Sequence, residues 1–521
     1  MRLAHGMGLA RCNRLKDQVM RQMKYVSTRG NGEYIKASDA IRLGIAGDGG
    51  LFTPESIPHY TSKEMQSLVN YNYQDLATEI LSRFLGDYSP AELKKMVQAA
   101  YSYPDKFDDP EVTPVRALDN HRYLLDLWHG PTCAFKDIAL QLLPHLMTKA
   151  SELADEGKEI VILVATSGDT GKAALEGFKN VPGTRIIVFF PEQGVSEIQR
   201  LQMVTQEGDN THVVSVRGNF DDAQSGVKQI FGDPLLAEKL SQNSLAFSSA
   251  NSINWGRLAP QIVYYFYGYN ALCRKQAIQM GDKVNIAVPT GNFGNILAAF
   301  IAGQMGLPVQ KLICASNSNN VLTDFIKNGC YDRNRKFYTT ISPSMDILIS
   351  SNLERLLYYF SNGDCGLVKD WMNQLKTSGC YQVNRATAEK IGREFYGGYA
   401  SEAQTMAQIH KTFQEHKMII DPHTAVGVEV HDQYRRESGD NTPVLIASTA
   451  SPFKFNSSVL KAIGEEVTES NEFALLEKLE SLTGLKIPNS LAELARKNVC
   501  HSGGCSKEEM ATAVQKILGI K

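Results

Sequence analysis

His129-Gly-Pro-Thr-Cys-Ala-Phe-Lys136-Asp137 is the stretch from which the fold and chemistry of this chain can be approached. Its lysine, Lys136, follows a Gly-Pro turn and an aromatic residue, and an apolar run typical of a helix comes after it. A lysine amine attacks a carbonyl only when it is neutral, and a pocket that excludes water favours the neutral form by lowering the pKa. Lys136 is therefore a candidate for a Schiff base with an aldehyde.

The bulk properties exclude several classes of protein. The chain has 521 residues, which is too long for one small core and predicts about two or three domains. The net charge of −2 provides no basic surface for nucleic acid, and no apolar run approaches the roughly 20 residues of a membrane span, so we expect neither partner. The nine cysteines are scattered without a CxxC motif, which indicates reduced thiols and a cytoplasmic protein.

Neither end of the chain indicates a functional site. Residues 1–22 carry several basic side chains against one acid, Asp17, but lack the serines of a transit peptide. We expect a leader or a disordered extension there. Near the other end, Cys500, His501 and Cys505 lack a fourth ligand nearby, so no metal site is expected.

The order of the predicted elements indicates an α/β protein with a helical N-terminal region. Residues 23–112 are expected to form a mainly helical domain, because helical patterns fill much of this segment and a polar, proline-bounded stretch ends it. Strands rich in Val and Ile then alternate with helices, which predicts parallel sheets. We expect a large α/β domain from residues 113–150 and 255–521 and a smaller one from 151–254. Buried strands are expected at 123–127, 160–165, 185–190, 213–216, 284–288, 311–315 and 444–448.

The segment Gly291-Asn292-Phe293-Gly294-Asn295 follows one buried strand and opens a helix. The first backbone N–H groups of a helix have no partner within it, and the helix dipole adds positive potential, so anions bind there. The segment has no Lys-Ser/Thr pair and is not GxGxxG, which argues against a nucleotide loop. It suits a single phosphate ester, and the alternative is a plain tight turn.

A second loop of this design is Ser167-Gly168-Asp169-Thr170-Gly171, which adds hydroxyl groups. Ser167 and Thr170 suit a carboxylate such as that of an amino acid. The alternative is that Asp169 or Thr170 caps the following helix.

Two other segments carry polar groups suited to a ligand. Thr449 follows a buried strand, where its hydroxyl could bond a ring nitrogen, although ordinary strand-end packing is the alternative. Arg257, with Asn254 close by in the sequence, could hold a second phosphate by charge-assisted hydrogen bonds, with a surface salt bridge as the alternative. A lysine for an aldehyde, a loop for a phosphate and a hydroxyl for a ring nitrogen together describe pyridoxal 5′-phosphate. The second anion site indicates a substrate that is itself a phosphate ester.

These residues resemble the threonine synthase family, and the similarity extends over nearly everything after Met23. The resemblance implies a fold-type-II pyridoxal-phosphate enzyme, in which two open parallel-sheet α/β domains accompany a mainly helical N-terminal domain. That N-terminal region resembles the longer branch of the family, found in fungi and many bacteria. Besides the lysine motif, the segments that carry the resemblance are Tyr25 to Gly30, Asp48 to Leu51, Ser167 to Gly171, Asn251 to Arg257, Gly291 to Asn295, Met345 to Ile347, Ser350 to Arg355, Asp421 to Ala425 and Thr449 to Phe455.

The resemblance also implies a reaction, the conversion of O-phospho-L-homoserine and water to L-threonine and phosphate. Lys136 would bind the cofactor aldehyde and move protons, and Thr449 would face the pyridine nitrogen. The substrate carboxylate would lie at Ser167 and Thr170, and its phosphate at Asn254 and Arg257 together with Lys454. The cofactor phosphate would be held by Gly291, Asn292, Phe293, Gly294 and Asn295.

The sequence departs from the family pattern at Cys133, Lys172 and Ser451, and the first two put substrate detail in doubt. The nearest alternative is a phospho-lyase of the same fold, which would release phosphate from a related ester without making threonine. A non-catalytic homologue is a further alternative. The sequence leaves open whether the chain is a monomer or a homodimer.

Overall fold

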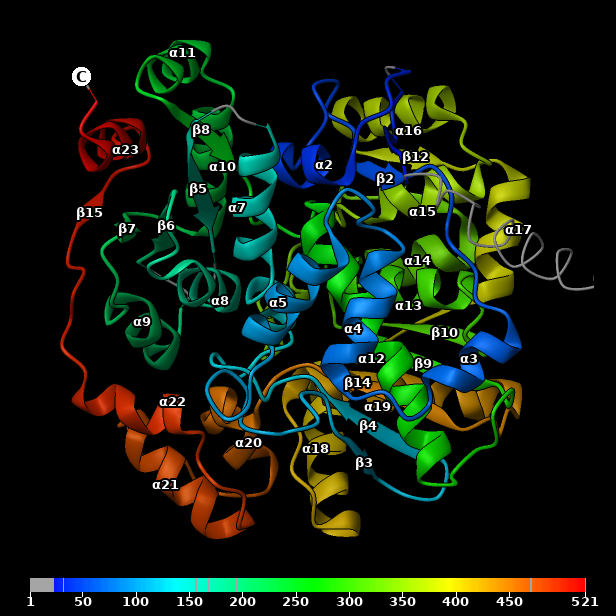
Figure 1. Cartoon of the computed structure of the whole chain (residues 1–521). Helices are drawn as coiled ribbons and strands as arrows, with labels where there is room; N and C mark the ends of the chain where they lie inside the picture. The colour runs from blue at the N-terminus through cyan, green and yellow to red at the C-terminus, as the bar shows by residue number, and fades with distance from the viewer. Residues whose placement is uncertain are drawn as a thin grey trace, which may run out of the picture.

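The structure is a computed structural model, and it describes residues 23–30, 32–154, 157–166, 168–192, 195–468 and 471–520. The expected leader at 1–22 and the predicted ligand Ser167 lie outside the described residues. Two sheets form the cores of two lobes, which we call the large lobe and the small lobe (Figure 1).

The large lobe is built on a six-stranded sheet in the order β13-β10-β9-β14-β4-β3. All neighbouring strands are parallel except β3, which pairs antiparallel with β4 at one edge. The central strands are buried along their whole length, because helices cover both faces of the sheet. The strands are β3 (Val115–Ala117), β4 (Arg122–Asp126), β9 (Val284–Pro289), β10 (Val309–Ser316), β13 (Phe395–Tyr399) and β14 (Val444–Ser448).

The small lobe contains a five-stranded, all-parallel sheet in the order β15-β7-β6-β5-β8. Its strands are β5 (Glu159–Ala165), β6 (Thr184–Pro191), β7 (Thr211–Val216), β8 (Leu245–Ser248) and β15 (Gly504–Cys505). Its helices are α8 (Asp169–Phe178), α9 (Glu197–Val204), α10 (Phe220–Phe231), α11 (Pro234–Gln242) and α23 (Met510–Leu518). The predicted parallel α/β architecture is confirmed for both lobes.

Helix α12 (Trp255–Arg274) runs through the centre of the molecule, and every residue from Trp255 to Leu272 is buried. Helix α6 (Lys136–Leu140) packs against both α12 and α8 of the small lobe, and α7 (Leu143–Ala154) packs mainly against α2 (Ala37–Leu43). The other helices outside the small lobe and the N-terminal region are α13 (Gly294–Gln304), α14 (Val321–Asn328), α15 (Leu353–Phe360), α16 (Cys365–Thr377), α17 (Arg385–Glu394), α18 (Glu402–His416), α19 (Pro422–Ser438), α20 (Asn456–Ala462), α21 (Glu472–Thr483) and α22 (Asn489–Ala492). Short elements complete the lobe: the hairpin β11 (Cys330–Asp332) and β12 (Cys380–Gln382), and the 3₁₀ turns η1 (Pro343–Met345), η2 (Pro452–Phe455) and η3 (Glu493–Arg496).

The N-terminal region is mainly helical, as predicted. A short antiparallel pair, β1 (Tyr25–Ser27) and β2 (Phe52–Pro54), accompanies α2 (Ala37–Leu43), α3 (Ser62–Leu68), α4 (Tyr73–Ser82) and α5 (Pro90–Ala100). The helices α3, α4 and α5 begin at side-chain caps, which satisfy the otherwise unpaired N–H groups of their first turns. Helix α4 packs against α12, so this region covers the large lobe (Figure 1).

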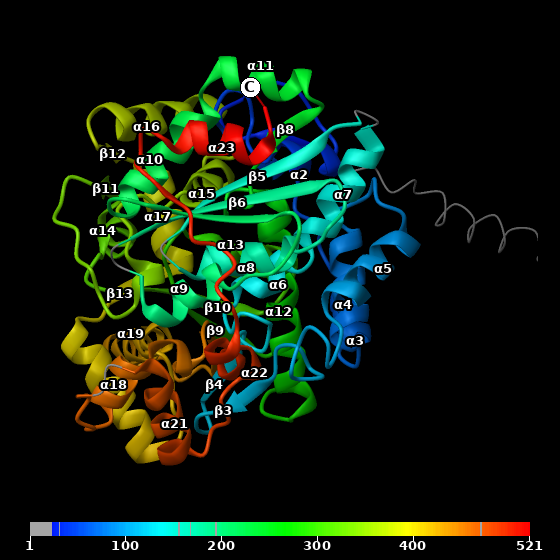
Figure 2. The ribbon, with the colours of Figure 1, turned by 90° about the vertical axis from the view of Figure 1, so that its left-hand side faces the viewer.

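The C-terminal segment crosses from the large lobe to the small lobe, a path that the sequence analysis did not anticipate. Helix α20 packs against α18, α21 packs against α20, and η3 lies against α9. Strand β15 then joins the small sheet beside β7, and α23 packs on α10 (Figure 2). The domain limits expected from the sequence stay a prediction, but residues 504–518 are part of the small lobe by their strand pairing and packing.

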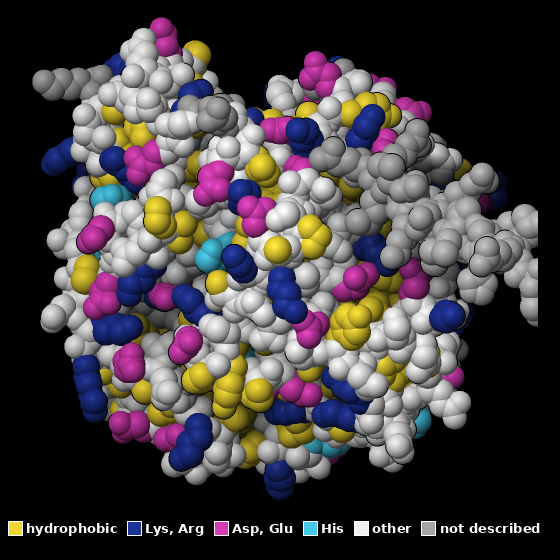
Figure 3. All heavy atoms as spheres, viewed as in Figure 1, with side chains coloured by type: hydrophobic (Ala, Val, Ile, Leu, Met, Phe, Trp, Pro, Cys, Tyr) yellow, Lys and Arg dark blue, Asp and Glu magenta, His cyan; other side chains and the backbone are white. Residues whose placement is uncertain are grey.

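The surface seen in Figure 3 carries acidic and basic side chains interspersed over most elements. Among the helices of the described ranges, none combines the length and the apolar character of a membrane span.

Candidate active site

The topology places three of the predicted ligand segments at one edge of the large sheet. Strands β9, β14 and β4 are neighbours and parallel, so their carboxyl ends lie side by side. The Gly291–Asn295 loop follows β9, Thr449 follows β14, and the lysine motif follows β4. The Phe135 N–H donates to the Thr449 carbonyl at 2.9 Å, which joins the lysine segment directly to the end of β14.

Lys136 is the first residue of α6, and its side chain is 11% exposed. Its Nζ lies 3.2 Å from Ser344 Oγ and 3.5 Å from Asp169 Oδ2. Burial lowers the pKa of Lys136, the Asp169 carboxylate opposes this shift, and the charges of Lys454 and Arg257 reinforce it. The amine is therefore closer to its neutral, nucleophilic form than a surface lysine would be.

The Gly291–Asn295 loop is shaped to bind an anion with its backbone. Phe293 adopts φ 62°, and this left-handed conformation turns the chain into α13. A side chain at Gly291 would bring a Cβ to 2.6 Å from the Ser344 carbonyl, so only glycine fits there. Ser350 Oγ donates to the Gly291 carbonyl at 2.8 Å, and Asn352 donates to the Asn292 carbonyl at 3.1 Å.

A buried polar atom in the same loop also lacks a partner. Asn295 is 7% exposed, and its Oδ1 accepts a hydrogen bond from the Tyr265 hydroxyl. Its Nδ2 is buried and has no hydrogen-bond partner among the described residues. Buried donors are nearly always satisfied, so a ligand acceptor is expected at this position. The backbone N–H groups at the start of α13 and the Asn295 Nδ2 donor together suit a phosphate group.

Asp169 is the first residue of α8 in the small lobe, and its side chain points toward Lys454 and Lys136. Its Oδ1 lies 2.6 Å from Lys454 Nζ and accepts from Gln199 Nε2 at 3.2 Å, and its Oδ2 accepts from Ser344 Oγ at 3.2 Å. The Lys454 side chain is fully buried. Burial opposes ionisation of Asp169, but Lys454 and Lys136 outweigh it and hold its pKa well below the ordinary value.

Arg257 is a buried guanidinium that forms no ion pair with any carboxylate in the described part of the chain. It is 2% exposed, its Nη1 donates to the Ala250 carbonyl at 2.6 Å, and its Nε finds no partner among the described residues. Burial lowers the pKa of Arg257 to about 10. A buried cation is normally paired, so this side chain is expected to meet an anionic ligand.

The other two predicted substrate ligands in the described residues are Asn254 and Thr170. Asn254 is the N-cap of α12: its Oδ1 accepts from Gly256 N–H at 2.8 Å, and its Nδ2 donates to the Ile41 and Ser249 carbonyls. These contacts orient the turn that carries Arg257. Thr170 is the second residue of α8, beside Asp169.

The sequence analysis missed Ser344 and Gln199, both of which contact Asp169. Ser344 lies in η1 and its hydroxyl bridges Lys136 and Asp169, and Gln199 lies in α9 of the small lobe. Neither residue follows a strand or stands in a glycine-rich loop, so no local signal distinguishes either of them from an ordinary polar residue.

The three residues that depart from the family pattern, Cys133, Lys172 and Ser451, are each held by contacts within the described structure. Cys133 is buried with φ 59°, and burial raises the pKa of its thiol to about 12. Lys172 pairs with Glu176 at 3.3 Å and with Gln206. Ser451 is the N-cap of η2, and its N–H donates to the Cys133 carbonyl at 3.0 Å.

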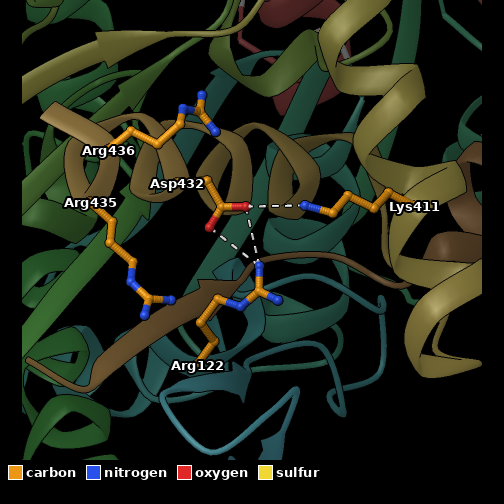
Figure 4. A pocket seen from close by; sticks show the side chains of 5 residues that line it. All are labelled: Arg122, Lys411, Asp432, Arg435 and Arg436. Atoms are coloured by element: carbon orange, nitrogen blue, oxygen red, sulfur yellow. Dashed lines mark hydrogen bonds and ion pairs between the residues drawn. The ribbon is translucent and has the colours of Figure 1, made fainter. Parts of the chain in front are cut away.

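A cavity of about 410 Å³ lies at the other end of the large sheet (Figure 4). It is lined by Arg122, which begins β4, by Lys411 of α18, and by Asp432, Arg435 and Arg436 of α19. Arg122 pairs with Asp432 at 3.2 Å, and the lining carries four basic side chains against this one acid. It shares no residue with the cluster around Lys136. In the described part of the chain, no three His, Cys, Asp or Glu side chains are grouped to hold a metal ion.

Comparison with known proteins gives three family matches along the chain. Residues 24–101 match the family model described as "Threonine synthase N terminus", residues 108–450 match "Pyridoxal-phosphate dependent enzyme", and residues 424–497 match "Threonine synthase, C-terminal". The "Threonine synthase" of Pseudomonas aeruginosa is 38% identical over 91% of this chain and 97% of its own length. The human protein "Threonine synthase-like 1" is 41% identical over 84% of this chain, but the chain spans only 58% of that relative's length.

Solved structures of threonine synthases are also similar to this chain. The crystal structure of threonine synthase from yeast superposes with a TM-score of 0.85 at 34% identity, covering 96% of this chain and 99% of the yeast chain. The structure of pyridoxal-phosphate-bound threonine synthase from Brucella melitensis gives a TM-score of 0.83 at 36% identity, covering 95% and 98% of the two chains. The expected fold is confirmed, and the chain belongs to the threonine synthase family of pyridoxal-phosphate-dependent enzymes.

Proposed function

We propose that the protein is a threonine synthase, which converts O-phospho-L-homoserine and water to L-threonine and phosphate. The observation that carries the proposal is the set of buried cations beside the reactive lysine. Lys454 and Arg257 are both buried, and both influence Lys136 electrostatically. Among the described residues, Asp169 is the one carboxylate that pairs with Lys136 and Lys454. A cofactor phosphate at the Gly291–Asn295 loop would leave these cations available for a second phosphate, that of the substrate.

Lys136 and Thr449 would have different roles toward the bound cofactor. Pyridoxal phosphate, when bound, supplies an electron sink that makes protons on the substrate carbons acidic. Lys136 Nζ, with its lowered pKa, would take and return these protons. Thr449, which is 5% exposed at the end of β14, would place a neutral hydroxyl at the ring nitrogen.

The substrate would be held by groups from both lobes. Arg257 has donors left over for a phosphate, and Lys454 could exchange part of its contact with Asp169 for the same ligand. Thr170, with Ser167 before it, would hold the substrate carboxylate at the start of α8. Asn254 would contribute by fixing the turn that carries Arg257.

The test is incubation of the pyridoxal-phosphate-loaded protein with O-phospho-L-homoserine, with phosphate, threonine, 2-oxo acid and ammonia measured together. Equal amounts of phosphate and threonine are expected, and a Lys136→Ala variant should form neither. Phosphate with a 2-oxo acid and ammonia would overturn the proposal in favour of a phospho-lyase. Absence of phosphate release would overturn it in favour of a homologue without this activity.

We also propose that the protein works in the cytoplasm as a monomer or a homodimer. The eight cysteines of the described residues are all free, which supports a reducing compartment. Light scattering during gel filtration would give the oligomeric state, and a mass above that of two chains would contradict the proposal. Fractionation of source cells would test the compartment.

A further inference from the structure

The segment Asp421-Pro422-His423 forms a buried hydrogen-bonded pair at the start of α19. Asp421 is 0% exposed and His423 is 2% exposed. Asp421 is the N-cap of the helix, and its Oδ1 accepts both the His423 N–H at 2.9 Å and a hydrogen bond from His423 Nδ1 at 2.7 Å. The carboxylate therefore does more than cap a helix, because it also orients the imidazole ring.

The hydrogen bonds of His423 define the tautomer of its ring. The backbone N–H of Ser344 donates to His423 Nε2 at 3.2 Å. Since Nε2 accepts this hydrogen bond, the ring proton is on Nδ1, where it is donated to Asp421. The Phe455 ring packs edge-on against the imidazole at 4.9 Å between centroids and limits its rotation.

Ser344 connects His423 to the Lys136 amine through hydrogen bonds. Its hydroxyl accepts from Lys136 Nζ and donates to Asp169 Oδ2, each at 3.2 Å. Its carbonyl occupies the space beside Gly291, where a Cβ would come within 2.6 Å. The turn at Ser344 thus lies between the lysine and the anion-binding loop, and its backbone N–H is held by His423.

We infer that His423, oriented by Asp421, is a positioning residue for Lys136, acting through the turn at Ser344. The ring accepts the Ser344 N–H and thereby sets where the Ser344 hydroxyl lies, and the hydroxyl sets where the Lys136 amine points relative to Asp169. The inference deepens the proposed function and rests on Lys136 being its reactive amine. Neither Asp421 nor His423 needs to touch the substrate for this role.

Three variants separate this role from a general loss of packing. His423→Leu removes the acceptor, and His423→Gln keeps an amide oxygen that can accept the Ser344 N–H. Asn285→Ala is the matched control, because Asn285 is also fully buried and its Nδ2 donates to Asp440 at 3.0 Å at the far end of β9. Each variant is measured for its urea midpoint as apoprotein, its dissociation constant for pyridoxal phosphate from the visible band, and its kcat and KM for O-phospho-L-homoserine.

His423→Leu is expected to bind pyridoxal phosphate about tenfold more weakly and to lose about tenfold or more in kcat, because one oriented hydrogen bond is lost. Its KM should stay within about threefold. His423→Gln should recover most of both losses, and Asn285→Ala should lower the urea midpoint without changing cofactor affinity. If His423→Leu matches Asn285→Ala in cofactor affinity and kcat, the inference is overturned.

Two points keep the test decisive. If His423→Leu does not fold, Ser344→Ala, which leaves α19 intact, should show the same weakening of cofactor binding, and wild-type affinity in that variant would overturn the inference. Cofactor affinity is measured without substrate. The inference about His423 can therefore succeed or fail even if the protein makes no threonine.

Discussion

Asp169 of the small lobe and Lys454 of the large lobe form a buried ion pair with 2.6 Å between Oδ1 and Nζ. The pair joins the two lobes, because Asp169 begins α8 and Lys454 lies in η2 just after β14. Lys136 also contacts this carboxylate, so one acid bridges two lysines.

Removing the charge of Asp169 should destabilise the protein. Asp169→Asn leaves the Lys454 ammonium buried without a counter-charge, which should lower the free energy of unfolding by about 3 kcal/mol. Adding Lys454→Met to the same chain should recover much of this loss. Urea unfolding of the apoproteins measures both effects. Arg385→Gln is the control, because Arg385 is 93% exposed in its pair with Glu389 and should change little. An Asp169→Asn variant as stable as this control would contradict the prediction.

A methyl group at Gly291 should weaken cofactor binding. The new Cβ would lie 2.6 Å from the Ser344 carbonyl, so the loop or the turn must shift. We expect Gly291→Ala to raise the dissociation constant for pyridoxal phosphate at least tenfold, measured by absorbance. In Gly303→Ala, at the other end of α13, the Cβ would meet Val309 at an ordinary 3.5 Å. That control should keep wild-type affinity and gain about 0.5–1 kcal/mol of stability from the better helix former.

Two buried arginines should respond in opposite ways to the same substitution. Arg257 donates to one acceptor among the described residues, the Ala250 carbonyl, whereas Arg355 donates to the Phe52 and Ile253 carbonyls and to Asn352. Arg257→Gln should raise KM for O-phospho-L-homoserine about tenfold or more, because a charge-assisted phosphate contact is lost, while stability changes little. Arg355→Gln should lower stability and leave KM nearly unchanged. Steady-state kinetics and urea unfolding of both variants decide this, and equal behaviour would refute it.

Asp137 should make stability depend on pH. Burial raises its pKa to about 6, although Thr132 donates to it from N–H and hydroxyl. The unfolded value is about 3.9, so between about pH 4 and pH 6 the native state binds more protons than the unfolded state, and stability falls as pH rises through this window. The full penalty, about 3 kcal/mol, is then present above about pH 6.

The Asp137→Asn variant isolates this effect, because the amide cannot ionise. Its free energy of unfolding relative to wild type should increase between about pH 4.5 and pH 7. Urea unfolding at several pH values measures the difference. A constant difference across this range would show that Asp137 keeps an ordinary pKa in the folded protein.

Much of the fold could be predicted from the sequence because the signals are local. The run Val284–Val288 is apolar at nearly every position, as a parallel strand covered on both faces requires, and the helical patterns of α3, α4 and α5 are marked by caps at their starts. Lys136, the Gly291–Asn295 loop and Thr449 could be placed at one edge, because carboxyl ends of neighbouring parallel strands meet there.

The partners of these residues could not be predicted in the same way. The contacts of Asp169 with Lys454 and of Ser344 with Lys136 join segments far apart in the chain, and the side chains carry no periodic or turn signal. The same holds for the crossing of β15 to the small sheet. The sequence alone determined which strands and loops form, and it predicted Lys136 as the reactive amine, because these signals lie in neighbouring residues. The tertiary structure alone decided which charges face that amine, because burial and pairing arise only when the two lobes pack together.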